Sequence, residues 1–350
     1  EKRKRDHLNP FRDGAVNART ATTWLEHVHL VHQALPELDY GSVDLTTTFA
    51  GHSFGAPLFI TGMTGGTPEA ARINRAIAAA AGKCGAGFGL GSMRAMLENP
   101  ELADTYRVRD CAPGLFVAGN IGGTQLLRYD VDRIGRAVEA VGADALCVHL
   151  NPAQELVQPE GDRDFRQVVD AIGRVVRDLK KPVIVKETGA GMSREVVTRL
   201  AGVGVGYVDV AGVGGTSWVG VETMRQGGEA DPEMMAFWDW GLPTAAAIGE
   251  AAGCGVEIIA SGGVRTGLDA ARALAMGATL AGVAAPILNA YFSGGQAGCE
   301  RAMNKMIDGI RMAVSLTGSG SIERLKQTPR VITGPLLDWM RQRKQGPANV

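Results

Sequence analysis

Four polar side chains lie close together in the segment His149-Leu150-Asn151-Pro152-Ala153-Gln154-Glu155, which begins where a short apolar run ends. A lone histidine is most often structural, but this density of polar groups within one short segment indicates contact with a ligand. Glu155 adds a hard oxygen donor of the kind that Mg²⁺ prefers. The segment is therefore the first candidate for binding and catalytic residues.

A second candidate is Lys186, which ends the apolar run at 182–185 and precedes Glu187. A lysine at such a strand end can lie beside the N1 and O2 edge of a flavin, where its charge stabilises the anionic reduced ring. The alternative is a structural lysine paired with Glu187. The position of Lys186, which matches that of the other polar candidates, favours the functional interpretation.

Segments of glycine and other small residues that follow other apolar runs could hold a phosphate. They offer small side chains and backbone N–H groups at residues 62–66, 91–94, 120–123 and 261–265, which contain glycine, and at Ala284 and Ala285. A single glycine of this kind can simply make a tight turn, but five such segments together favour a phosphorylated cofactor. The last two ranges correspond to the usual phosphate site of an eight-stranded barrel.

The elements that would position these residues recur along the chain. Eight short apolar runs begin at residues 57, 86, 115, 145, 182, 206, 256 and 279, and most are followed by a stretch with helical apolar spacing. Alternating strands and helices predict a (β/α)8 barrel with parallel strands. An open doubly wound sheet permits the same alternation, but no G-x-G-x-x-G turn follows the first run.

We predict one domain over residues 1–350, because a barrel needs about 250 residues plus extensions. Residues 1–56 form an N-terminal arm and lead-in, residues 57–290 the barrel core, and residues 291–350 a helical C-terminal extension. A connection at 212–242 contains three tryptophans and is long enough to cover the carboxyl-terminal face of the barrel, where barrel enzymes carry their active sites.

Composition excludes several classes of protein. The 36 basic and 37 acidic residues leave a net charge of -1, which argues against a nucleic-acid partner. No apolar run approaches the roughly 20 residues of a membrane span, so we expect no membrane partner. The five cysteines form no close pair, and no apolar stretch follows the basic N-terminus, so we expect a reducing, cytoplasmic location.

Over nearly its whole length the sequence resembles the type 2 isopentenyl-diphosphate Δ-isomerases. The resemblance rests on Arg3-Lys4 with His7, and on MTGG at 63–66, GSMR at 91–94, HLNPAQE at 149–155, KETGAG from 186, GVGGTSW from 212, WGLPT from 240 and SGGVRTG from 261. It implies FMN on the carboxyl-terminal face of the barrel, reduction by NADPH, Mg²⁺ on a diphosphate, interconversion of isopentenyl and dimethylallyl diphosphate, and a homo-oligomer, either a tetramer or an octamer.

Carried over position by position, the resemblance implies three sets of site residues. FMN would be bound by Gly62, Met63, Thr64, Gly65, Ser92, Asn120, Lys186, Thr216, Gly262, Gly263, Val264, Arg265, Ala284 and Ala285. Substrate would meet Arg3, Lys4, Ser92, Met93, Arg94, His149, Asn151 and Gln154, with Glu155 on the metal. The family commonly has Gln where this chain has Met93, which puts a side-chain contact there in doubt.

The polar residues at the strand ends suit the isomerisation that the resemblance implies. Moving a double bond needs a proton added at one carbon and removed from its neighbour, with no net electron transfer, and a reduced flavin can exchange protons. Lys186 would set the charge of the ring, while Gln154 and His149 offer polar contacts to the reacting end. These three residues are the predicted catalytic set.

Two other functions share parts of this pattern. An FMN-dependent barrel oxidoreductase of the 2-hydroxy-acid oxidase class needs a catalytic histidine near the seventh strand, where this chain reads ASGGVR. A non-catalytic flavin-binding barrel would need neither the HLNPAQE segment nor Arg3 and Lys4.

Overall fold

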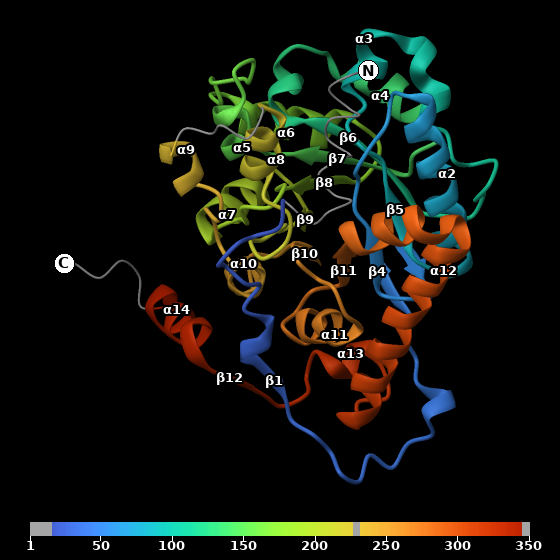
Figure 1. The fold of residues 1–350 in the computed structure, drawn as a ribbon, viewed down its shortest axis with the longest axis vertical. Coiled ribbons are helices and arrows are strands. Elements are labelled where there is room, and N and C mark those ends of the chain that lie inside the picture. The colour runs from blue at the N-terminus through green and yellow to red at the C-terminus, as the bar shows by residue number, and fades with distance from the viewer. Residues whose placement is uncertain (1–15, 227–231, 345–350) are drawn as a thin grey trace.

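The computed structural model describes residues 16–226 and 232–344. Eight parallel strands close into a barrel in chain order, the last pairing with the first. The predicted (β/α)8 fold is confirmed, and each predicted apolar run contains one strand of the barrel (Figure 1). The strands are β4 (Leu58–Ile60), β5 (Gly87–Gly89), β6 (Val117–Gly122), β7 (Ala145–His149), β8 (Val183–Lys186), β9 (Tyr207–Asp209), β10 (Glu257–Ala260) and β11 (Leu280–Val283).

Most of the longer helices pack on the barrel because each buries one apolar stripe against it, as do those that begin at residues 68, 131, 168 and 194. Their starts are set by side-chain caps where the sequence provides them, as at Thr67, Asp130, Ser193 and Thr266. The helices between strands are α2 (Pro68–Lys83), α3 (Arg94–Glu98), α4 (Val131–Ala140), α5 (Pro152–Val157), α6 (Val168–Asp178), α7 (Arg194–Gly202), α8 (Trp218–Arg225), α9 (Pro232–Ala236), α10 (Thr244–Ala251) and α11 (Gly267–Ala275), with 3₁₀ turns η3 (Pro100–Thr105) and η4 (Gly123–Leu127).

The amino-terminal end of the barrel is closed by an antiparallel hairpin, β2 (Thr47–Phe49) with β3 (His52–Phe54). Phe49 and Phe54 are buried with Phe116 and the inward-facing side chains of the barrel. This apolar plug leaves only the carboxyl-terminal ends of the strands open to a ligand. Before the hairpin come η1 (Leu25–His27), β1 (Val28–Leu30) and η2 (Tyr40–Ser42).

The C-terminal extension begins with α12 (Ala285–Leu316), a long helix that is kinked at Gly294 and Gly295 and lies against α2 in Figure 1. It runs across the boundary that the sequence suggested at residue 290. Then follow α13 (Ile322–Leu325), β12 (Arg330–Ile332), which pairs with β1, and α14 (Gly334–Lys344). No helix in the described part of the chain is both long and apolar enough to span a membrane.

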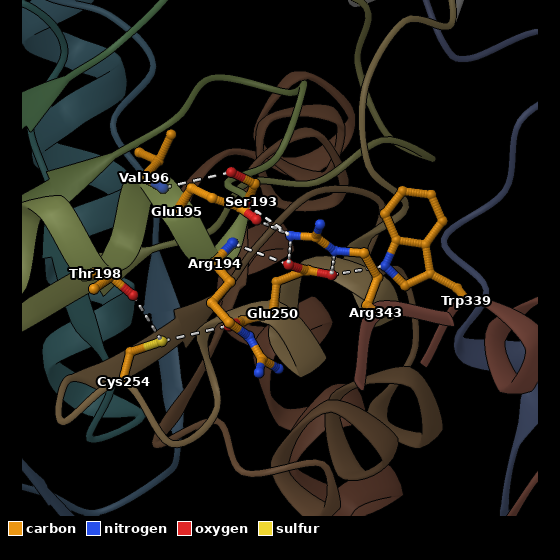
Figure 2. Close-up of polar contacts among 9 residues, drawn as sticks. All are labelled: Ser193, Arg194, Glu195, Val196, Thr198, Glu250, Cys254, Trp339 and Arg343. Carbon is orange, nitrogen blue, oxygen red and sulfur yellow. Dashed lines mark hydrogen bonds and ion pairs between the residues drawn. The ribbon is translucent and has the colours of Figure 1, made fainter. Parts of the chain in front are cut away.

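The last helix, α14, is hydrogen-bonded to one buried carboxylate, Glu250 on α10 (Figure 2). Its oxygens accept hydrogen bonds from Arg343 and Trp339 of α14 and from the backbone N–H of Arg194 at the start of α7. Arg343 also pairs with Glu195 on α7 at 2.7 Å. Although burial alone would raise the pKa of Glu250, the bonds from Arg343 and its neighbours hold it below its usual value.

Candidate functional site

A single cavity of about 550 Å³ opens at the carboxyl-terminal ends of the barrel strands, within the usual range for a small-molecule or cofactor site. It brings together nearly all of the predicted residues that the structure describes. Its walls include Gly62, Met63, Thr64, Gly65, Ser92, Arg94, Asn120, His149, Asn151, Gln154, Glu155, Lys186, Thr216, Gly262, Gly263, Val264, Arg265, Ala284 and Ala285.

Met93 is the exception among the predicted residues that the structure describes. Its side chain is fully buried, and its sulfur and terminal methyl group lie against Gly119 inside the barrel wall, away from the cavity. Its backbone N–H donates to the carbonyl of Asn120 at 2.7 Å. The substrate contact predicted for Met93 is therefore not supported. Arg3 and Lys4 lie outside the described residues.

The wall that follows β7 is a chain of hydrogen-bonded polar groups. The amide nitrogen of Asn151 donates to Oε1 of Gln154 at 3.1 Å and to Oε1 of Glu155 at 2.9 Å. The other oxygen of Glu155 accepts from the backbone N–H of Asp162 at 2.8 Å. Proline at the start of α5 places Gln154 and Glu155 on the first turn of that helix. The segment thus presents its amides and its carboxylate together.

A carboxylate that the sequence did not single out lies behind this wall. Glu222 on α8 has a fully buried side chain, and its Oε1 accepts a hydrogen bond from the amide nitrogen of Gln154 at 2.8 Å. Gln158 donates to the same oxygen, and Arg225 donates to Oε2 at 2.8 Å. The only signal in the sequence is an acidic residue inside the apolar stretch at 218–224, which is weak because such residues are usually solvated.

His149 is held neutral by its surroundings. Asn120 donates its amide N–H to the carbonyl of Leu90, so its oxygen faces Nδ1 of His149 at 2.8 Å and accepts from it. The pKa of His149 falls to about 3 because the ring is buried and because Lys186 lies nearby. The neutral ring therefore carries its proton on Nδ1 and leaves Nε2 as an acceptor.

Lys186 is buried beside the cavity in register with His149 on one side and Asp209 on the other. Its ammonium group donates to the backbone carbonyl of Glu187. The carboxylate of Glu187 instead accepts from the backbone N–H groups of residues 188–190. No ion pair joins Lys186 to Glu187 among the described residues, so the purely structural pairing loses its support.

The opposite wall is formed by two glycine-rich loops packed backbone to backbone. Gly262 adopts a φ of +98°, and a Cβ there would lie 2.0 Å from the carbonyl oxygen of Gly212. Helix α12 begins beside this wall without a side-chain cap at Ala284, and both Ala284 and Ala285 line the cavity. Pro286 has no N–H, and those of Ile287 and Leu288 donate to the carbonyl of Ala284, which leaves the first residue of the helix, Ala285, as its backbone donor toward the cavity. Together with Arg265 and the glycine-rich backbone, this donor fits the phosphate of a mononucleotide such as FMN.

A metal would find two carboxylates in the cavity lining, Glu155 and Glu98, of which Glu98 already pairs with Arg94 at 2.9 Å. No group of three or more histidine, cysteine, aspartate or glutamate side chains in the described part of the chain could enclose an ion. Glu155 alone fits Mg²⁺ only if the ligand itself supplies most of the remaining oxygens, as phosphate groups do for Mg²⁺.

The connection between β9 and α10 covers one side of the cavity, as its length suggested. Thr216 and Trp218 from this connection line the cavity, and so does Asn17 from the N-terminal extension. Trp238 lies behind them, packed against Gly220. Trp240 remains largely exposed, so the three tryptophans do not share one role.

Fold, cavity and sequence relatives together define the class. The family model described as FMN-dependent dehydrogenase matches residues 152–332, about half of the chain. Solved structures of a mandelate oxidase variant with the monooxide FMN adduct and with (S)-mandelic acid share the fold, each at a TM-score of 0.66. They are 18% and 19% identical, cover 93% and 95% of this chain, and are covered over 96% and 97% of their own length. The chain is therefore an FMN-dependent-dehydrogenase-type barrel.

Closer relatives narrow the class to one family. The chain is 43% identical to the isopentenyl-diphosphate delta-isomerase of Thermococcus kodakarensis, over 97% of this chain and 94% of that protein. It is 46% identical to the protein of the same name from Halobacterium salinarum, over 98% of this chain and 96% of the relative. The chain belongs to the type 2 isopentenyl-diphosphate delta-isomerases.

Proposed function

We propose that this chain interconverts isopentenyl diphosphate and dimethylallyl diphosphate, using reduced FMN held in the cavity described above. The observation that carries the proposal is the pairing of two unlike walls in one cavity. One wall offers glycine-rich backbone and Arg265 for a phosphate, and the other offers the amides and carboxylate of 149–155. Membership of the isomerase family supports the same reaction.

Reduced FMN, when bound, supplies an electron-rich ring with exchangeable protons, suited to a reaction that moves protons without net oxidation. The residues of this chain bind FMN and favour one charge state of its ring. The uncapped start of α12 and Arg265 meet the phosphate, and the charge of Lys186 favours an anionic ring. His149, held neutral, adds no positive charge to that of Lys186.

The amides of the strand-end wall orient the reacting end of the substrate. Because Glu222 only accepts, Gln154 turns its nitrogen to Glu222 and its oxygen toward Asn151. Gln154 is therefore a fixed dipole beside the carbon that gains or loses a proton. It can position a proton without adding charge to the cavity.

The diphosphate would be held at the rim of the same wall. We assign Mg²⁺ to Glu155, with ligand oxygens from the diphosphate, and assign Arg94 and Ser92, which line the same cavity, to the phosphates. Arg3 and Lys4 complete this set in the proposal. Eleven residues lie between Lys4 and Val16, a length that can span up to about 40 Å, so the arm is long enough to reach the cavity.

The Mg²⁺ assignment predicts that Glu155→Gln raises the metal concentration needed for half-maximal activity, because an amide is a weaker ligand than a carboxylate. Activity measured against MgCl₂ checks it. Equal curves for the variant and the native protein would remove Glu155 from the metal site.

Three further features belong to the proposal. NADPH reduces the flavin once before turnover, the chain assembles as a tetramer or an octamer, and it works in the cytoplasm. All five cysteines are free, in keeping with a reducing compartment.

The deciding experiment is incubation of the reduced, FMN-loaded protein with isopentenyl diphosphate, followed by identification of the product. The protein should be yellow when oxidised, should form dimethylallyl diphosphate only after reduction, and should consume no reductant per turnover. One NADPH used per product, or oxygen consumed with a 2-hydroxy acid, would establish an oxidoreductase instead. The latter is disfavoured because His149 alone among the described histidines lines the cavity.

A further inference from the structure

The N-terminal strap, which we define as residues 16–23, lies against the two glycine-rich loops, 212–215 and 261–265, that form the wall proposed for the FMN phosphate. Its residues 16–18 pair with residues 215–217 through backbone hydrogen bonds of 2.7 and 2.8 Å and an isolated antiparallel bridge. The strap therefore adds a short stretch of antiparallel backbone to the first loop, at the edge of the cavity.

Thr23, at the other end of the strap, packs against both loops at once. A Cβ on Gly214 would lie 2.4 Å from the backbone nitrogen of Thr23, and a Cβ on Gly263 would lie 2.5 Å from its methyl carbon. The carbonyl of Thr23 accepts a hydrogen bond from the backbone N–H of Ala245, on α10, at 2.9 Å. Because these contacts leave no room even for a methyl group, the strap and the two loops are one packed unit.

Asn17 brings the strap to the cavity itself. It lines the cavity, and its Oδ1 lies 3.4 Å from Nη2 of Arg265. A guanidinium can only donate, so the amide turns its oxygen toward Arg265 and its NH₂ group away from it. That NH₂ group has no acceptor in the part of the chain that the structure describes. Asn17 thus offers an unused amide donor beside the charge of Arg265.

Asp239 and Trp238 fix the backbone that follows Asn17. The carboxylate of Asp239 accepts from the three backbone N–H groups of residues 19–21, at 2.9, 2.7 and 3.0 Å. The indole N–H of Trp238 donates to the carbonyl of Asn17 at 2.9 Å, and the guanidinium of Arg19 lies 3.7 Å from the centre of the Trp238 ring. Burial would raise the pKa of Asp239, but these bonds hold it below its usual value, so the carboxylate keeps its charge.

We propose that Asn17 is a further cofactor-binding residue, whose amide N–H meets the phosphate of FMN beside Arg265, and that Asp239 is the positioning residue that holds it there. A phosphate oxygen only accepts hydrogen bonds, so it suits both the NH₂ group of Asn17 and the guanidinium. Asp239 does not line the cavity and therefore acts only through the strap. The inference rests on the FMN binding of the proposed function.

The test compares the affinities of FMN and of riboflavin, which lacks the phosphate, for the full-length protein freed of flavin. Asn17→Leu keeps the size of the side chain but removes its amide. We expect the Kd of FMN to rise at least about tenfold, as for loss of a hydrogen bond to a charged acceptor, and that of riboflavin to stay within about twofold. Asn304→Leu is the matched control, because Asn304 is exposed on α12 and does not line the cavity.

Asn17→Asp separates the amide donor from the contact with Arg265. A carboxylate keeps an acceptor for Arg265 but replaces the NH₂ donor by a second, charged acceptor. FMN affinity should therefore fall further than in Asn17→Leu, because the carboxylate repels the phosphate. Riboflavin affinity should again stay unchanged.

Asp239→Asn tests the positioning role. It removes the charge and one acceptor oxygen, so the strap is held less firmly and the Kd of FMN should rise by about threefold to tenfold. In an Asn17→Leu background the same change should raise the Kd no further, because its effect passes through the Asn17 amide.

Tryptic cleavage of the Arg19–Thr20 bond reports on the strap directly, because Arg19 must leave the Trp238 ring before it can be cut. Coupling between two sites is reciprocal, so FMN should slow this cleavage, and a saturating concentration of riboflavin should not. In Asn17→Leu, FMN should lose that protection. Mass spectrometry of the fragment that begins at Thr20 measures the rate.

The outcomes are distinct. Equal losses of FMN and riboflavin affinity in Asn17→Leu overturn the inference, because the strap would then support the fold without binding the phosphate. Unchanged FMN affinity in Asn17→Leu or in Asn17→Asp overturns it as well. A fully additive effect of Asp239→Asn in the Asn17→Leu background overturns the positioning role. A native protein that bound neither flavin would end the proposed function first, and the inference with it.

Discussion

At the scale of single residues, the direction of the Gln154 amide depends on a neighbour that can only accept hydrogen bonds. Glu222 receives bonds from Gln154, Gln158 and Arg225, and all of its own oxygens are used as acceptors. An ionised carboxylate therefore excludes the flipped amide, in which two oxygens would face each other. Orientation at this position is a property of the pair, not of Gln154 alone.

We expect Gln154→Asn and Glu222→Gln to lower turnover strongly, on the order of the ~100-fold associated with a positioned proton-transfer group. The first change withdraws the amide by one methylene, and the second allows the amide to flip. Steady-state kcat with bound FMN intact is the measurement. Glu160→Gln is the control, because Glu160 bonds to Arg225 on the half-exposed rim of the same network. Wild-type turnover in both test variants would return the proton chemistry to the flavin alone.

The neutral state of His149 makes a prediction about acid. Its folded pKa of about 3 lies below the unfolded value of roughly 6.5, so below pH 6.5 the unfolded chain binds a proton that the folded chain does not. Stability therefore falls as pH drops from 6.5 toward 3, by at most about 1.4 kcal/mol per pH unit from this group. His149→Gln should flatten that slope in urea denaturation of the FMN-free protein. An equally steep slope in the variant would assign the acid sensitivity elsewhere.

At the scale of elements, the two glycine-rich loops form the wall proposed for the FMN phosphate only because their backbones touch. Gly262→Ala places a Cβ 2.0 Å from the carbonyl oxygen of Gly212 and forces a left-handed conformation on alanine. We expect loss of FMN affinity by at least about tenfold, from strain of roughly 1–3 kcal/mol and displacement of the loop. Binding of FMN to the apoprotein, followed by flavin fluorescence, is the measurement.

Gly253→Ala is the matched control for this change. Gly253 also has a positive φ, +82°, but no atom lies within 4 Å of the Cβ that alanine would add. It should cost about 1–2 kcal/mol of stability from the backbone conformation alone and leave FMN affinity unchanged. If both variants lose FMN equally, general destabilisation rather than the packing of the two loops explains the result.

A site residue could be predicted from the sequence when a barrel strand sets its position. Residues at strand ends were predictable because parallel strands bring all their carboxyl ends to one face of a barrel. Met93 was not, because it lies beyond the end of β5, at the residue before α3, where no strand sets the direction of its side chain: Ser92 and Arg94 line the cavity, and the side chain between them packs in the core. Glu222 lies in the connection after β9, where likewise only tertiary packing places the side chain.

At the scale of the whole molecule, the segments before and after the barrel both bond to its outer elements. Residues 16–18 pair with the connection after β9 at the edge of the cavity, and α14 bonds to Glu250 of α10, which also accepts from the start of α7 (Figure 2). Trp339 also contacts Trp24, with ring centres 6.2 Å apart, so the last helix packs on the N-terminal extension as well. The two extensions therefore pack against each other, and the N-terminal one also reaches the cavity through Asn17.

This arrangement predicts that Arg343→Met destabilises the fold without changing FMN affinity or KM. Glu250 is buried, and losing its cation leaves an uncompensated charge, which we expect to cost about 2 kcal/mol at pH 7 after allowance for the partial exposure of Arg343. In the native protein the depressed pKa of Glu250 contributes stability above its unfolded value of roughly 4.3, and that contribution is lost as pH falls through the folded pKa. In Arg343→Met burial would instead raise the pKa, so the difference between the two proteins should shrink from pH 7 to pH 4. Urea denaturation at both pH values measures it.

Glu195→Gln is the control, because it removes only the exposed partner of Arg343. It should leave the urea midpoint nearly unchanged. A loss of stability as large as that of Arg343→Met would place the stabilisation in the surface pair rather than in the buried one.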